Sequence, residues 1–157
     1  MTHRPPFPLL AAAALTLVSG LAQADTGKLL LTGEAFNEAS REEAGRIAAA
    51  VENVKEVVND LRIAPTSTLS ARGNDSYISS KVKARFVDQK DFRIQQVKVT
   101  TEAGTVFLMG LVTEKEGNAA TEVARTTNGV QKVVRVFEHI SEEEARRLDN
   151  ITGSSTK

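Results

Sequence analysis

A short strand-like motif that ends in glycine occurs twice in the chain of 157 residues, and it constrains the fold more than any other feature. Residues 29–33 (LLLTG) recur as residues 106–110 (VFLMG), and each copy leads into a polar turn and a helix-like stretch. A Val-rich run closes each copy, at residues 54–61 and 130–137. A fixed order of similar segments indicates a duplicated supersecondary unit. The repeat therefore predicts two strand–helix–strand units.

The helix of each unit shows an apolar stripe of mostly small residues, which suits a helix lying flat on a sheet. In the first copy the stripe consists of Ala44, Ile47, Ala48 and Val51. In the second copy it consists of Ala119, Ala120, Val123 and Ala124, and Asn128-Gly129 is a plausible stop for that helix.

Only the second copy has a further half upstream. The caps Asn74-Asp75-Ser76 predict a helix from about Tyr77 to Val87, in which apolar residues recur every fourth position. Alternation over residues 97–101 predicts a half-buried strand, and Ala103-Gly104 turns it into residues 105–112 as a hairpin. The second unit is therefore helix, strand, strand, helix, strand, and the fold class is α+β.

The remaining segments divide the chain. Residues 1–24 combine Arg4, an apolar run and Ala22-Gln23-Ala24, which predicts a removable secretion signal, with a core helix or an uncleaved anchor as the alternative. We expect a partial unit at residues 27–63, a Pro/Ser/Thr-rich linker at 64–73 and a complete unit at 74–140. Residues 141–157 predict a short acidic helix to about Leu148 and a disordered tail.

Composition excludes several classes of function. Lys plus Arg equals Asp plus Glu at 20 each, so net charge does not draw the chain to nucleic acid. The absence of Cys excludes disulfides, thiolate metal sites and a lipid-modified cysteine. The two histidines, His3 and His139, do not form a metal-ligand pattern, and no phosphate loop or nucleophile elbow occurs. We expect no cofactor, no metal and no catalytic site.

The second unit resembles the BON domain. The resemblance rests on four segments, namely residues 74–78 (NDSYI), 97–102 (VKVTTE), 106–112 (VFLMGLV) and 129–134 (GVQKVV), with the linker in the expected place. The resemblance implies a small mixed sheet with two helices on one face. Within the family, the sequence is most similar to members with two BON units at the outer membrane. Such members are lipoproteins with a whole first unit, whereas this chain has no Cys and a partial one.

The resemblance also implies a function, which is binding of anionic phospholipid, such as phosphatidylglycerol, through the helix 77–87 in support of outer-membrane integrity. Cations beside apolar bulk on one helix suit an anionic membrane surface. The predicted lipid-binding residues are Tyr77, Lys81, Val82, Lys83, Arg85 and Phe86. The alternative for the apolar members is packing on the sheet with the cations in solvent. Gly33 and Gly110 are expected to serve the backbone.

The expected location is the periplasm, at the periphery of the outer membrane, with no membrane-spanning segment in the mature protein. A second hypothesis is a soluble periplasmic protein of osmotic or envelope stress, or a chaperone-like one, that binds an envelope protein through exposed sheet edges. An enzyme is the third and least supported hypothesis, since no acid, base and nucleophile come together in the sequence.

Overall fold

The computed structural model describes residues 27–89 and 96–153, which fall into two compact units, 27–66 and 67–153. Each unit is described by itself. The secretion signal predicted at residues 1–24 lies outside the described residues, as do residues 154–157 of the predicted tail.

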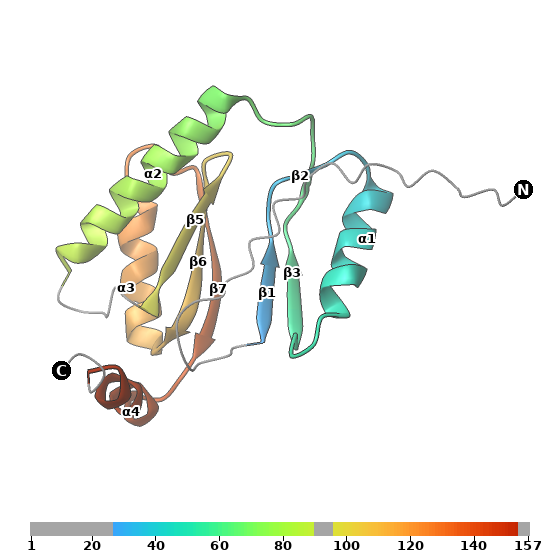
Figure 1. Ribbon diagram of the computed structural model, residues 1–157. Coiled ribbons are helices and arrows are strands. Elements are labelled where there is room, and N and C mark those ends of the chain that lie inside the picture. The colour runs from blue at the N-terminus through green and yellow to red at the C-terminus, as the bar shows by residue number, and fades with distance from the viewer. Residues whose placement is uncertain (1–26, 90–95, 154–157) are drawn as a thin grey trace, which may run out of the picture. The chain divides into compact units, whose positions relative to one another are not determined.

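Unit 1 is a small parallel arrangement of strands with one helix (Figure 1). Its elements are β1 (Lys28–Leu31), β2 (Glu34–Ala35), α1 (Glu38–Ala49), β3 (Glu56–Asn59) and β4 (Arg62–Ile63). β1 pairs with β3 and β2 pairs with β4, both in parallel, so α1 connects parallel strands. The Asn37 side chain caps α1 by accepting a hydrogen bond from Ser40 N at 2.8 Å. The predicted strand–helix–strand order is present.

The core of unit 1 is small. Its buried residues are Leu31, Ala35, Ala48 and Leu61, with Leu29, Ala44 and Val57 partly buried against them. The prediction that Ile47 and Val51 belong to this core is wrong, because their side chains are 50% and 42% exposed. Aligning the caps Asn37 and Thr113 places these two residues on Val123 and Thr127, which are buried in unit 2 where two helices pack together. The described part of unit 1 has no second helix to cover them.

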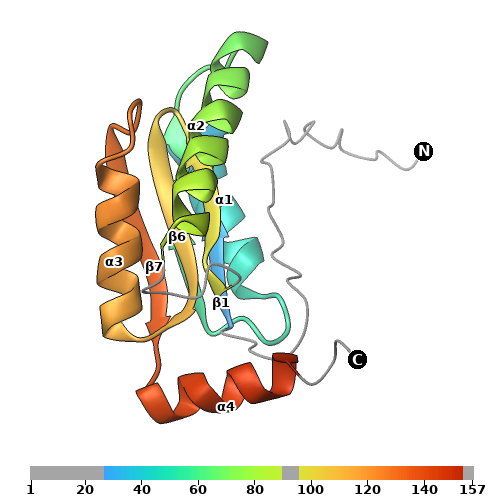
Figure 2. The same cartoon turned by 90° about the vertical axis from the view of Figure 1, so that its left-hand side faces the viewer.

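Unit 2 contains a three-stranded mixed sheet in the order β5-β6-β7. Its elements are α2 (Leu69–Val87), β5 (Lys98–Glu102), β6 (Thr105–Val112), α3 (Glu114–Arg125), β7 (Lys132–His139) and α4 (Glu142–Gly153). β5 and β6 form the predicted hairpin, and β6 is parallel to β7. Figure 2 shows α2 and α3 on the same face of this sheet. The predicted α+β class and the α-β-β-α-β order are confirmed.

The core of unit 2 lies between that face and the two helices. Its most enclosed members include Ile78, Val82, Val106, Leu108, Ala120 and Ala124. Small residues bring α3 close to the sheet, and a capping box between Thr113 and Glu116 fixes where α3 begins.

Two helices are longer than predicted. α2 begins at Leu69, because the Thr68 side chain caps it by accepting from Ala71 N at 3.2 Å. Residues 69–73, predicted as linker, are therefore helical, and Asn74-Asp75-Ser76 is not a cap. α4 continues to Gly153 rather than ending near Leu148, with the Ser141 side chain accepting from Glu144 N and Ala145 buried.

The two glycines of the repeat, which we expected to serve the backbone, both have positive φ. Gly33 has a φ of +117° and Gly110 a φ of +149°, a region that side chains disfavour. A Cβ on Gly110 would lie 1.8 Å from the carbonyl oxygen of Gln96, so the approach to β5 requires glycine. A Cβ on Gly33 would meet nothing nearer than Leu61, at 4.0 Å.

Candidate functional site

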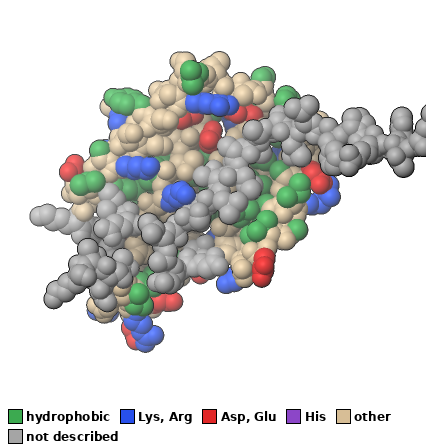
Figure 3. All heavy atoms as spheres, in the orientation of Figure 1, with side chains coloured by type: hydrophobic (Ala, Val, Ile, Leu, Met, Phe, Trp, Pro, Cys, Tyr) green, Lys and Arg blue, Asp and Glu red, His purple; other side chains and the backbone are tan. Residues whose placement is uncertain are grey.

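The outward side of α2 carries large apolar side chains in solvent. Leu69 is 87% exposed, Tyr77 62% and Val87 70%. With 3.6 residues per turn, separations of 8 and 10 residues bring these three onto one side of the helix. Small exposed residues fill the positions between them, and we define the outer stripe as Leu69, Gly73, Tyr77, Ser80, Ala84 and Val87. Figure 3 shows apolar and basic side chains together on the surface over α2.

Four cations flank the outer stripe, and they fall into two pairs. Arg72 and Lys83 lie on one flank and are exposed. Lys81 and Arg85 lie on the other flank and are partly buried. Within the described residues 69–88, which comprise α2 and its C-cap, Asp88 is the one exposed carboxylate. This side of unit 2 is therefore apolar in the middle and basic at its margins.

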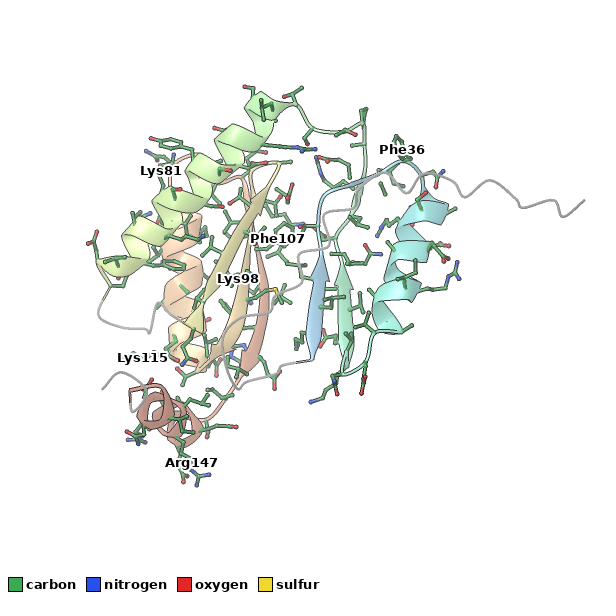
Figure 4. All side chains as sticks on the ribbon, in the orientation of Figure 1. Phe36, Lys81, Lys98, Phe107, Lys115 and Arg147 are labelled. Atoms are coloured by element: carbon green, nitrogen blue, oxygen red, sulfur yellow. The ribbon has the colours of Figure 1, made fainter. Side chains whose placement is uncertain are left out.

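Lys81 and Arg85 also hold the end of α3. The Lys81 ammonium donates to the carbonyl oxygen of Asn128 and lies 4.6 Å from the centre of the Tyr77 ring (Figure 4). Arg85 Nη1 donates to the carbonyl oxygen of Val123 at 3.0 Å and to Thr127 Oγ1 at 2.8 Å. Positive charge at the C-terminal end of a helix stabilises its unpaired carbonyls. These two predicted site residues therefore have a structural role as well.

Val82 and Phe86 face the opposite way. Their side chains are 0% and 1% exposed and pack in the core of unit 2. The expectation that they contact lipid is corrected: they recur on the side of α2 that lies against the sheet, so a membrane does not reach them. The predicted residues that remain on the surface are Tyr77, Lys81, Lys83 and Arg85.

A buried carboxylate fixes where α2 lies on the sheet. Asp75, 7% exposed, accepts from Ala103 N at 2.8 Å and from Gly104 N at 2.9 Å, the two amides of the β5–β6 turn. Both turn residues have positive φ, so their N–H groups point together toward the carboxylate. One turn further along, Ser79 Oγ and Thr101 Oγ1 hydrogen-bond at 2.7 Å. α2 is thereby tied to the hairpin at two points.

The sequence had pointed to only part of this site. Leu69, Arg72 and Val87 were missed because Leu69 and Arg72 were assigned to the linker and Val87 to the helix end. Thr68, read as an N-cap for a helix that begins at residue 69, is the signal that could have identified Leu69 and Arg72. Asp75 was taken for a cap because its partners lie 28 and 29 residues away.

The arrangement suits adsorption to an anionic surface, because cations border an exposed apolar area. Within residues 27–89 and 96–153, no three His, Cys, Asp or Glu side chains gather as metal ligands would. None of the helices in these residues combines the length and the apolar character needed to cross a bilayer. What the site offers is exposed apolar area bordered by cations.

Comparison with known proteins agrees with the repeat. The model of the BON domain family matches residues 22–65 and again residues 74–139. Over 115 residues the chain is 37% identical to the outer membrane lipoprotein DolP of Haemophilus influenzae, covering 73% of this chain and 59% of that protein. It is 35% identical over 114 residues to a 21 kDa hemolysin of Actinobacillus pleuropneumoniae, with 73% of this chain and 59% of the hemolysin covered.

A third relative, the osmotically-inducible protein Y of Escherichia coli, is 30% identical over 112 residues, which cover 69% of this chain and 56% of the relative. The chain thus spans less than two thirds of each of these three relatives. The family match, in contrast, extends over most of both units. The chain belongs to the BON-domain family.

Proposed function

We propose that this protein is a non-catalytic envelope protein that binds anionic phospholipid at the periplasmic face of the outer membrane through the outer stripe of α2. The observation that carries the proposal is the exposure of Leu69, Tyr77 and Val87 on one side of a helix that cations border. An aromatic ring with a polar tip is suited to the boundary between headgroups and acyl chains. Similarity to an outer membrane lipoprotein supports the location.

The expected affinity follows from area and charge. Full burial of a Leu or Val side chain contributes about 1.5–3 kcal/mol, and the three large residues of the outer stripe would be buried only in part. Each cation near an anionic surface contributes about 1 kcal/mol. Arg72 and Lys83 are free to contribute in full, because no α3 carbonyl engages them. The sum predicts reversible binding that depends on anionic lipid and weakens with salt.

Vesicle co-sedimentation tests the proposal. The full chain is mixed with vesicles of phosphatidylcholine alone and of phosphatidylcholine with phosphatidylglycerol, at low and at physiological salt. We expect binding to the phosphatidylglycerol vesicles and little binding to the neutral ones. Equal binding to both vesicle types, or none to either, would refute the proposal and leave the protein-binding alternative in place.

A pair of charge-reversal variants locates the surface. Arg72→Glu/Lys83→Glu removes two cations, worth about 2 kcal/mol, and adds two carboxylates that the anionic surface repels, so the partition coefficient should fall by at least about 30-fold. Lys115→Glu/Lys132→Glu makes the same change in net charge at exposed positions of α3 and β7 and should have little effect. Lys81 and Arg85 are left intact because their loss would also disturb α3. Equal losses in the two variants would mean that net charge, and not α2, governs binding.

A further inference from the structure

A tight turn joins α3 to β7, and it contains the only Asn-Gly pair in the sequence, Asn128-Gly129. Val130 N donates to the carbonyl oxygen of Thr127 at 3.1 Å, which closes the turn around these two residues. Both are exposed, and Gly129 has a φ of +97°, a value that glycine adopts without strain. Asn128 therefore lies in solvent and is followed by a residue that has no side chain.

This turn lies against the flank of the outer stripe that carries Lys81. The Lys81 ammonium donates to the main-chain carbonyl oxygen of Asn128, and it lies 4.6 Å from the centre of the Tyr77 ring. A Cβ on Gly129 would lie 3.2 Å from Ile78 Cγ1 and 3.5 Å from Lys81 Nζ. Charges interact over a Debye length of about 8 Å at physiological salt. A charge on Asn128 would therefore act on the margin of the proposed lipid contact.

The peptide group between Asn128 and Gly129 is suited to attack the Asn128 side chain. Its oxygen accepts from the Lys81 cation, and in the described part of the chain its N–H group has no hydrogen-bond acceptor. Loss of that proton places negative charge on the peptide group, partly on its oxygen, and the ammonium of Lys81 stabilises this charge. Because Gly129 has no Cβ, its nitrogen can approach Cγ of Asn128 without obstruction.

We propose that Asn128 is a deamidation site whose conversion to a carboxylate weakens the binding of anionic lipid to the outer stripe. The proposal rests on the proposed function and adds a regulation of the same surface. Gly129 N gives its proton to hydroxide and bonds to Asn128 Cγ, and the side-chain nitrogen leaves as ammonia after taking a proton from water. A second water molecule opens the five-membered imide to aspartate or isoaspartate. The net change is amide plus water to carboxylate plus ammonium.

The product has one more negative charge at the edge of the site. The new carboxylate offsets the charge of Lys81 beside it, and anionic headgroups repel the carboxylate itself. The partition coefficient on anionic vesicles should therefore fall about fivefold, which corresponds to about 1 kcal/mol for one charge near an anionic surface. An isoaspartate also adds a carbon atom to the main chain, so it displaces the carbonyl oxygen to which Lys81 donates.

Peptide mass spectrometry of the full chain, incubated at neutral pH and raised temperature, tests the modification. The readout is the mass gained when an amide becomes a carboxyl group. We expect Asn128 to deamidate at least tenfold faster than Asn118 and Asn150, which are exposed in α3 and α4 but precede Ala119 and Ile151. If the Asn128 amide persists as long as the other two, the proposal is overturned and the proposed function still stands.

Co-sedimentation with phosphatidylglycerol vesicles tests the consequence. Asn128→Asp should bind about fivefold more weakly than the fresh chain. Asn118→Asp, which adds the same charge beside Arg135 of β7, should stay within twofold. Asn128→Gln keeps an amide that cyclises more slowly, so its binding should survive the incubation that weakens the unsubstituted chain. Equal binding by Asn128→Asp and Asn118→Asp overturns the regulation alone, whereas a fresh chain that does not bind refutes the proposed function and the regulation together.

Discussion

Replacing Asp75 should cost unit 2 a large part of its stability, although the residue lies in a helix that faces solvent. Its carboxylate accepts from Ala103 N and Gly104 N at 2.8 and 2.9 Å and is 7% exposed. Hydrogen bonds to a charged group contribute about 1.5–3 kcal/mol each. Asp75→Ala leaves both amides without this acceptor, so we expect the free energy of unfolding to fall by about 3–6 kcal/mol. The total free energy of unfolding of a native protein is only about 5–15 kcal/mol.

Asp75→Asn keeps the shape of the side chain but changes its hydrogen bonds. The amide keeps one acceptor oxygen, but its NH₂ group then faces a backbone donor, so about half of the loss, about 1.5–3 kcal/mol, should remain. Asp88→Asn is the matched control, because Asp88 is exposed at the end of the same helix and its side chain has no hydrogen-bond or ion-pair partner in the described part of the chain. It should change stability by no more than about 0.5 kcal/mol.

Guanidinium unfolding followed by far-UV circular dichroism and by tyrosine fluorescence measures the stability of all three variants. Tyr77 is the only Tyr and the chain has no Trp, so its emission reports on α2, two residues from the substitution. We expect the transition seen by Tyr77 to move to lower denaturant in the order Asp88→Asn, Asp75→Asn, Asp75→Ala. If Asp75→Asn and Asp88→Asn agree within 0.5 kcal/mol, the carboxylate does not hold the turn and the reasoning fails.

Two further predictions concern the glycines and the end of α3. Gly110→Ala should destabilise unit 2 by about 2–6 kcal/mol, since it adds a clash of about 1–3 kcal/mol to backbone strain of about 1–3 kcal/mol. Gly33→Ala should destabilise unit 1 only by the backbone strain. Equal losses of stability in Gly33→Ala and Gly110→Ala, measured by denaturant unfolding, would contradict the contact between Gly110 and Gln96. Arg85→Met should speed amide exchange in the last turn of α3 by about tenfold or more, as the carbonyl of Val123 and the hydroxyl of Thr127 lose their donor. Lys83→Met is the control, and exchange that changes equally in both variants would rule out the cap.

The sequence allowed the duplicated strands and the hairpin to be predicted, because each depends on residues close together along the chain. The recurrence of Ile78, Val82 and Phe86 every fourth residue was also visible, but it did not show that Val82 and Phe86 lie in the core rather than against lipid. Features that depend on contacts between residues far apart in the sequence could not be predicted. The exposure of Ile47 depends on a helix that the described unit 1 does not have, and the role of Asp75 depends on a turn almost 30 residues away. Lys81 and Arg85 could be placed on α2 by spacing, but their bonds to the end of α3 could not.

The inward and outward sides of α2 have different roles in the structure. Asp75, Ser79 and the buried apolar residues determine its position from inside, and nothing in the outer stripe takes part in that. A library of substitutions along α2 should therefore show tolerance that rises and falls with the helical period. Substitutions in the outer stripe should therefore change the proposed lipid contact and leave the fold of unit 2 unchanged.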